Sequence, residues 1–274
     1  VTLSDTPTNA QLALIDAATT GNITYSGSND YTVSDSTISA GQLNSLDAQY
    51  SGTVDATAVT TITGTAADIT TVYSSSGISG LGNEAVTITD TPSITELNNI
   101  TAQTTGVVTA TLAANSIANL ASLATAATDQ ITITINDADA TSITAADLST
   151  LGGKTAGTVT VTNAVNIIGD HDQLTAALVT AGTKVEVSDA TVIINDANAT
   201  SITAAELAAI GAATTGTVTV TNAVAITGTT AQLTAALVTA STKVTASTSN
   251  LTITDTPTTD ELNALDAATT GNIT

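Results

Sequence analysis

One motif recurs about ten times along this chain and restricts the folds open to it. A short run rich in Thr, Val and Ile leads through a Ser, Thr or Asp into about three turns of Ala- and Leu-containing helix, and the unit closes on a small turn, often Thr-Gly. Turn glycines recur roughly every 50 to 60 residues, with a second, less regular turn about halfway between most of them. The unit is therefore about 23 to 33 residues long, as is typical of repeat proteins. The turn glycines are Gly21, Gly52, Gly106, Gly157, Gly216 and Gly271.

These turns divide the chain into nine full repeats, preceded by a partial one. We expect the repeats to form one continuous array over residues 1–274. The sequence opens inside a repeat, from Val1 to Pro7, and ends on a near copy of that unit, so we expect it to be a window of a longer array. The predicted repeats are 22–52, 53–83, 84–106, 107–129, 130–157, 158–183, 184–216, 217–242 and 243–271.

The first half of each repeat has the pattern of a half-buried strand. Aliphatic residues alternate with threonine in Thr217 to Thr221, Thr158 to Thr162 and Ile131 to Ile135. One face of such a strand is apolar and the other is polar. A break and a second short apolar run, such as Val224 to Ile226, follow within the repeat. Each repeat is therefore predicted to have two strand sides and one helix side.

Capping pairs mark the starts of the predicted helices. A Ser, Thr or Asp is followed three residues later by an acid or an amide, and these side chains can satisfy the backbone N–H groups that a helix N-terminus leaves free. Nine such pairs occur in phase with the apolar pattern, which predicts a helix start at each of them. The pairs are Thr8 with Gln11, Ser39 with Gln42, Thr65 with Asp68, Ser93 with Glu96, Thr144 with Asp147, Asp170 with Gln173, Thr203 with Glu206, Thr229 with Gln232 and Thr258 with Glu261.

Each predicted helix carries a narrow apolar stripe. Such a stripe covers one facing surface, so every helix must lie on the strands of its own and neighbouring repeats. A helix separates successive strands, which favours parallel pairing and right-handed connections. The sequence thus predicts an α/β repeat solenoid with ten short helices and buried stripes, and a β-solenoid is the alternative. The stripes are Leu43 and Leu46, Leu97 and Ile100, Leu148 and Leu151, Leu207 and Ile210, Leu233 and Leu237, and Leu262 and Leu265.

The charge of the chain excludes several classes of partner. It has 24 acidic residues against three lysines, with a formal net charge of -21. Such a surface repels nucleic acid and anionic membranes, and no apolar stretch is long enough to span a membrane. An acidic, threonine-rich composition without Cys, Met, Trp or Phe is expected of abundant exported material. We therefore predict an extracellular or cell-surface location.

The segments Leu251 to Asp266 and Gly64 to Tyr73 show the style of the repeat most clearly. Over the whole chain, the pattern resembles the tandem β-strand repeat regions of giant bacterial cell-surface proteins, particularly the Thr/Ala/Asp-rich ones of cyanobacteria. The resemblance implies an adhesin, surface-layer or filament component. The calcium-binding nonapeptide with its Gly-Gly-x-Gly-x-Asp core is absent from the sequence, so its metal chemistry is not carried over.

The sequence offers little for catalysis, and we expect the protein not to be an enzyme. No nucleophile and base arrangement, nucleotide loop or zinc spacing occurs in it. His171, the single histidine, stands between Asp170 and Asp172, and this triplet could bind a cation or raise the pKa of the imidazole. The favoured interpretation is a solvated first helical turn, with Asp170 as the N-cap and the acids facing the helix dipole.

Acids at the strand ends are the candidate metal ligands, and calcium is the candidate metal. Neighbouring oxygens are densest at Asp137, Asp139 and Asp196, so calcium binding is hypothesised there. The favoured alternative is that each Asp makes a turn or caps the adjacent loop through its side chain. The acids in equivalent places are Asp5, Asp35, Asp90, Asp137, Asp196 and Asp255.

The threonine faces suggest one further hypothesis. Outward threonines on neighbouring strands would make a flat array that orders water, as ice-binding surfaces do. Glu186, Asp55 and Ser26 interrupt the columns, so ice binding is a remote alternative. The simpler account is that Thr favours strands while remaining soluble.

Two functional classes follow from these observations. The first is a structural extracellular protein that forms a shaft, filament or surface layer by head-to-tail or lateral association with itself or with the cell envelope. The second is an adhesin-type binding module. Binding surfaces usually carry exposed aromatic or Arg anchors, and this chain has almost none. The structural class is therefore the prediction.

Overall fold

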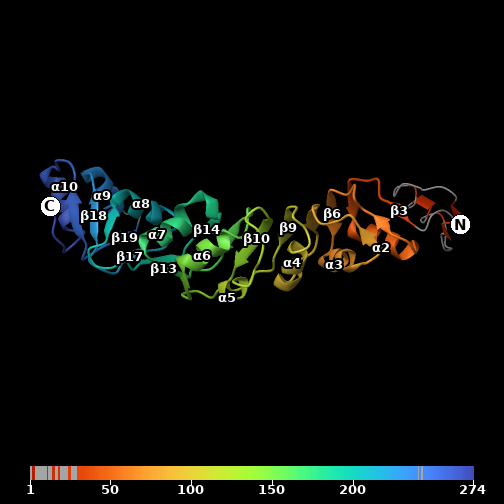
Figure 1. Ribbon diagram of the computed structural model, residues 1–274. Coiled ribbons are helices and arrows are strands. Elements are labelled where there is room, and N and C mark those ends of the chain that lie inside the picture. Colours follow the sequence, from red (N-terminus) through yellow and green to blue (C-terminus); the bar gives the residue numbers. More distant parts are fainter. Residues whose placement is uncertain are drawn as a thin grey trace. The chain divides into compact units, whose positions relative to one another are not determined.

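The computed structural model has a mixed α/β architecture in which short strands alternate with helices (Figure 1). It divides into two compact units. Unit 1 comprises residues 1–113 and 123–132, and unit 2 comprises residues 114–122 and 133–274. The described residues are 30–239, 241 and 243–274, with the strand backbones at 2–3 and 24–25 and the helical positions 11, 14, 15 and 18.

Unit 1 contains three parallel sheets and the helices that connect their strands. The sheet orders are β1-β2, β3-β5-β7 and β4-β6-β8-β9 followed by the first half of β10. The strands are β1 (Thr2–Leu3), β2 (Thr24–Tyr25), β3 (Tyr31–Thr32), β4 (Thr37–Ser39), β5 (Val54–Asp55), β6 (Thr61–Gly64), β7 (Ile78–Ser79), β8 (Ala85–Ile88), β9 (Val108–Thr111) and β10 (Gln130–Ile135). The helices are α2 (Ala40–Gln49), α3 (Ala66–Ser74) and α4 (Ile94–Thr101).

Unit 2 also contains three parallel sheets. Their orders are the second half of β10 followed by β12-β14, then β11-β13-β15-β17-β19, and β16-β18-β20. The strands are β11 (Ser142–Thr144), β12 (Val159–Val161), β13 (Asn166–Gly169), β14 (Val185–Val187), β15 (Thr191–Ile194), β16 (Ser201–Thr203), β17 (Val218–Val220), β18 (Ala225–Gly228), β19 (Val244–Thr245) and β20 (Asn250–Ile253). The helices are α5 (Ile117–Leu120), α6 (Ala145–Gly152), α7 (His171–Leu174), α8 (Ala204–Ala212), α9 (Thr230–Leu237) and α10 (Thr259–Asp266), with a π-helical turn η1 (Thr175–Val179) and a 3-10 turn η2 (Ala181–Thr183) after α7.

Every pairing between the described strands is parallel, which confirms this part of the sequence prediction. Residues about one predicted repeat apart lie side by side. In unit 2, Val192 pairs with Ile167 on one side and Val218 on the other, and Val218 pairs next with Val244. Both units therefore have a repeat-like α/β structure.

The predicted helix starts agree with the structure wherever it describes them. Eight of the nine predicted capping residues are N-caps whose side chains accept a hydrogen bond from the backbone N–H three residues later. The ninth, Thr8, lies outside the described residues. Helix α5 has a further N-cap that was not among the nine predicted, Ser116, which accepts a hydrogen bond from the N–H of Asn119. Among the described helices, none has the length and apolar character needed to cross a bilayer.

A leucine or isoleucine in the second turn anchors eight of the nine described helices to the core. This residue lies four positions after the N-cap, and in eight of the nine described helices it is fully buried. Alternate strand residues such as Val218 and Val220 form the rest of the core. The eight helix anchors are Leu43, Ile69, Leu97, Leu120, Leu148, Leu174, Leu207 and Leu233.

Two of the predicted stripe positions are not buried. Leu262 of α10 is 40% exposed although it follows its N-cap by the same four positions. Helix α10 packs on α9, and residues 267–274 contain no helix to cover its other side. Leu237 is only half-buried because α9 buries Leu233 and Ala236, three residues apart, and turns the next residue away from the core.

Candidate functional site

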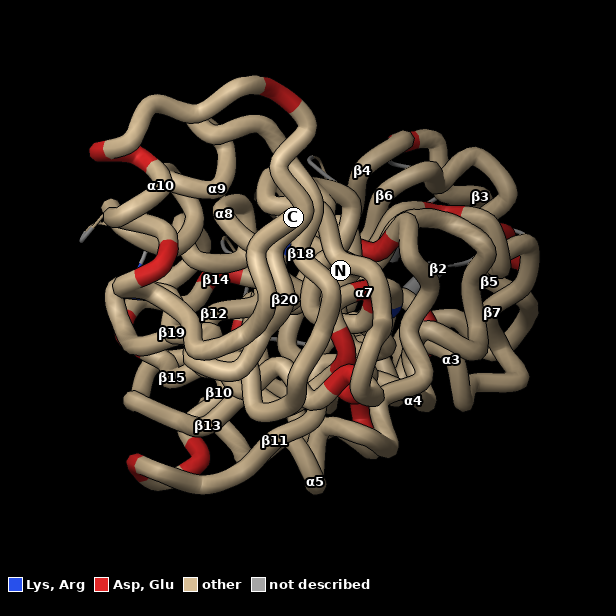
Figure 2. Tube along the Cα trace, turned by 90° about the vertical axis from the view of Figure 1, so that its left-hand side faces the viewer, with Lys and Arg blue, Asp and Glu red and all other residues tan. Residues whose placement is uncertain are grey.

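Aspartates at the strand ends cap the helices that precede them in the chain. In four places, the Asp carboxylate accepts the N–H of the first residue of the preceding helix, where the helix dipole also favours a negative charge. Figure 2 shows Asp and Glu dispersed along the trace, as this distributed role requires. The bonds run from Ala66 to Asp90 (2.9 Å), from Ile117 to Asp137 (2.7 Å), from His171 to Asp196 (2.8 Å) and from Thr230 to Asp255 (2.7 Å).

The structure thus gives these acids a role close to the favoured sequence interpretation, with one difference. They cap a helix of the preceding segment rather than their own loop. At Asp255, hydrogen bonds from the side chain and backbone of Thr230 lower the pKa of the carboxyl below its ordinary value. Asp5, which belongs to the same predicted set, lies outside the described residues.

The loops at 136–140 and 195–199 are two versions of one structure. Asp139 Oδ1 accepts the N–H of Ala164 at 3.1 Å, and Asn198 Oδ1 accepts the N–H of Ala223 at 3.1 Å. Each loop ends in an alanine with a left-handed backbone, at φ 61° and φ 64°. The amide oxygen of Asn198 therefore accepts the same hydrogen bond as the carboxylate oxygen of Asp139. This bond does not require the charge of Asp139.

Calcium binding at Asp137, Asp139 and Asp196 stays a prediction. The first two residues share one loop, and Asp196 lies in the other. Among the residues that the structure describes, no three His, Asp or Glu side chains gather into a group able to hold a metal ion.

If calcium binds, the melting temperature will be higher in millimolar calcium than in sodium chloride of matched ionic strength. Sodium alone gives only screening of the net negative charge. The matched variant is Asp139→Asn, which keeps the oxygen used at Asn198 but removes the charge, and it should reduce the calcium increment. Thermal unfolding by circular dichroism measures both proteins. Equal melting temperatures in the two buffers would contradict calcium binding.

The cap that Asp196 makes on α7 differs from the other three because the His171 side chain also contacts the capping carboxylate. Its Nδ1 lies 2.7 Å from Asp196 Oδ1, while its backbone N–H binds the other carboxylate oxygen. Asp196 is only 6% exposed, so the pair is shielded from water. Burial of the ring lowers the pKa of His171, but the hydrogen bond and charge of Asp196, with the charges of Asp172 and Glu206, outweigh it and raise the pKa. The predicted Asp170 N-cap is confirmed, and Asp172 lies 3.5 Å from Nε2 on the exposed side.

This arrangement predicts that His171 stabilises unit 2 more at low pH than at high pH. A pKa raised by folding gives stability that is fully present below the unfolded value of about 6.5 and is lost as pH rises through the higher folded value. The control is His171→Ile, which copies the Ile117 and Asp137 arrangement and has no titrating ring. Urea unfolding across this pH range should show the advantage of the wild type over the variant shrinking as pH rises. A constant difference would contradict the prediction.

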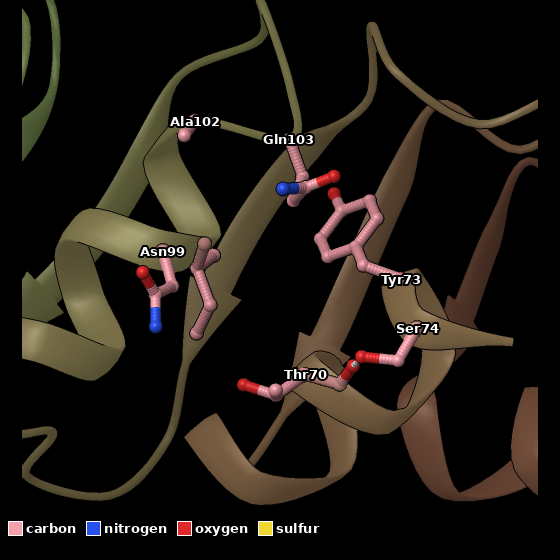
Figure 3. Close-up of a pocket in the computed structure, with 7 residues that line it drawn as sticks. Thr70, Tyr73, Ser74, Asn99, Ala102 and Gln103 are labelled. Carbon is pink, nitrogen blue, oxygen red and sulfur yellow. Dashed lines mark hydrogen bonds between the residues drawn. The ribbon is translucent and has the colours of Figure 1, made fainter.

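A hollow of about 260 Å³ lies between α3 and α4 in unit 1 (Figure 3). Thr70, Tyr73 and Ser74 enter it from α3, and Asn99 and Gln103 enter it from α4 and the turn after it. The Tyr73 hydroxyl donates a hydrogen bond to Glu84, which is fully buried. This hollow was not predicted from the sequence. The sequence feature that could have indicated it is a rare aromatic residue, Tyr73, followed by an acid, Glu84, that the fold buries.

Comparison of this chain with family models, curated proteins and solved structures finds no match.

Proposed function

We propose that the protein is a structural extracellular protein whose α/β repeats stack as a solenoid, with one short helix per repeat, into a shaft, filament or surface layer. Repetition is then the function, because the number of repeats sets the length and the contact between repeats sets the stiffness. We also propose a location outside the cell or on its surface, in keeping with the acidic composition and with the resemblance to cyanobacterial surface-protein repeats.

One recurring contact carries the proposal. After α4, α8 and α10, a buried threonine donates its hydroxyl hydrogen to a backbone carbonyl twenty or more residues earlier, in each case at 2.6 Å. The same threonine oxygen accepts the N–H of the turn glycine two residues later. The recurrence of one joint at three places along the chain favours a repeated structural array over a single binding centre. The donor and acceptor pairs are Thr104 and Glu84, Thr214 and Ala190, and Thr269 and Ser249.

Leu262 is the exposed counterpart of a helix anchor that a further repeat would bury, whether that repeat belongs to the same polypeptide or to another copy. Its counterpart Leu233 is fully buried, whereas Leu262 is 40% exposed on a helix of the same type. Parallel strands and a bare helix anchor form the kind of surface that another repeat would cover. We therefore propose head-to-tail stacking in an open, one-dimensional assembly.

Electron microscopy and sedimentation of the 274-residue chain test this proposal. We expect elongated particles that lengthen as concentration rises, because each stacking event leaves a new free end. Leu262→Glu should suppress lengthening by placing a charge on the stacking surface. Val179→Glu is the matched control, since Val179 is 38% exposed but belongs to η1 rather than to α10. Compact particles that remain monomeric at high concentration would contradict the proposal.

A further inference from the structure

The hollow between α3 and α4 contains a paired departure from the repeat. Tyr73 follows its N-cap by eight positions, where the corresponding helical segments have Leu178 and Leu237. Glu84 occupies the position equivalent to Ala190 and Ser249. The backbone carbonyl of each of these three residues accepts a hydrogen bond from the hydroxyl of the turn threonine. The other segments compared fill these two places without a buried charge. The Tyr and Glu pair is therefore not required by the fold.

The environment of Glu84 fixes the orientation of the Tyr73 ring. Glu84 is fully buried and accepts three hydrogen bonds, from the Tyr73 hydroxyl and from the backbone N–H groups of Gly82 and Asn83. Burial, together with this hydrogen bond, raises the pKa of Tyr73, so its hydroxyl stays protonated as a donor. Burying a carboxylate costs free energy that apolar packing would avoid. What the pair adds is a rigid, half-buried aromatic ring at the edge of the hollow.

The other side chains around the hollow supply neutral hydrogen-bonding groups. Thr70 and Ser74 donate their hydroxyl hydrogens to carbonyls of α3 at 2.7 Å each, which leaves their oxygens able to accept. Asn99 and Gln103 are exposed amides that can both donate and accept. Figure 3 shows Gln103 beside the hydroxyl end of Tyr73 and Asn99 on the α4 side. The buried Ile100 lies at the base of the lining.

We propose that this hollow binds one ring of a neutral saccharide. A sugar ring has an apolar C–H face that can lie on the Tyr73 ring, and hydroxyls at its edge that can pair with the amides and the threonine and serine oxygens. The lining has no charged side chain, and the net charge of -21 repels anions. The volume of about 260 Å³ lies just below the range of roughly 300 to 1,000 Å³ for drug-sized ligands, which suits a single ring. This inference does not depend on the shaft function.

Carbon-13 labelling of tyrosine gives one reporter that lines the hollow, Tyr73, and internal references in Tyr31 and Tyr50, which pack on each other. The probes are the methyl glycosides of glucose, galactose and mannose, with glucuronate as an anionic control. At millimolar concentration, at least one methyl glycoside should shift the NMR ring signals of Tyr73 and leave those of Tyr31 and Tyr50 unchanged. Glucuronate should shift none. The absence of a Tyr73 shift with all three glycosides, or an equal shift with glucuronate, would overturn the proposal.

Two variants test whether the lining makes the contacts, with affinity measured by calorimetry. Asn99→Ala with Gln103→Ala changes two exposed side chains and should weaken binding by about tenfold or more, with an unchanged melting temperature. Tyr73→Leu with Glu84→Ala introduces the residue types found at the equivalent positions 178 and 190, and it should abolish binding. If this second variant does not fold, the amide variant still decides the matter. Unchanged affinity in the amide variant would overturn the proposal.

Discussion

Replacing Leu207 with alanine is expected to lower the free energy of unfolding by about 2 to 5 kcal/mol. Leu207 is fully buried in α8, which packs against α9 and η1. The smaller side chain loses apolar contact with these neighbours and leaves a cavity that parallel strands and short helices cannot easily close. Urea unfolding followed by far-ultraviolet circular dichroism measures the loss.

Leu262→Ala is the matched control for this prediction. Both leucines lie four positions after a capping-box threonine, Thr203 in one helix and Thr258 in the other. Leu262 is 40% exposed, so truncating it should cost no more than about 0.5 to 1 kcal/mol in a monomeric sample. Similar losses for the two variants would show that the helix faces have been assigned incorrectly.

The sequence predicted the helix starts well because the capping chemistry is local. A side-chain oxygen and an N–H three residues away need no information about the rest of the fold, and eight N-caps were identified in this way. Helix α5 also fits the rule, because Ser116 is followed three residues later by the amide Asn119, but this pair was not among the nine named. The Asn119 side chain donates to Asn115 instead of reaching back to the N-cap, so α5 has only half of a capping box.

Which helix each strand-end acid caps depends on the register of strand pairing, and the sequence pattern does not fix that register. Gly169 pairs with Ile194, and this register places Asp196 beside His171, the first residue of the helix that follows Gly169. A shift of the pairing by one residue would turn the neighbouring side chains to the opposite face. The sequence could therefore identify Asp196 as a capping acid but not the helix that it caps.

The hollow beside Tyr73 could be predicted only by comparing repeats with one another. Taken alone, Tyr73 predicts only a large side chain on a helix, and Glu84 predicts only an exposed acid in a turn. Their contact becomes visible only when Thr104 and Thr214 are aligned, since this places Glu84 on the buried position of Ala190. Burial of a charged residue is rare and was not a reasonable expectation from composition alone.

Gly216→Ala is expected to destabilise the protein by about 1 to 3 kcal/mol through overpacking. A Cβ atom at this position would lie 2.2 Å from the carbonyl oxygen of Ala190 and 2.7 Å from its carbonyl carbon. The obstructing atoms are backbone, so relief requires the joint formed by Thr214 to open. The same close approach occurs at Gly106 and Gly271, at 2.2 Å and 2.1 Å. These three turn glycines are therefore required by the distance between neighbouring segments rather than by a left-handed backbone.

The control for this prediction is Gly41→Ala in α2, where an added Cβ meets nothing within 4 Å. Alanine at that helical position should stabilise the protein by about 0.4 to 1 kcal/mol, because it reduces the conformational freedom of the unfolded chain. The two substitutions add the same methyl group, so opposite signs in urea unfolding would isolate the effect of the close approach. A Gly216→Ala variant as stable as the wild type would show that the segments can separate at this joint, and the uniform rigidity of the proposed shaft would lose its structural basis.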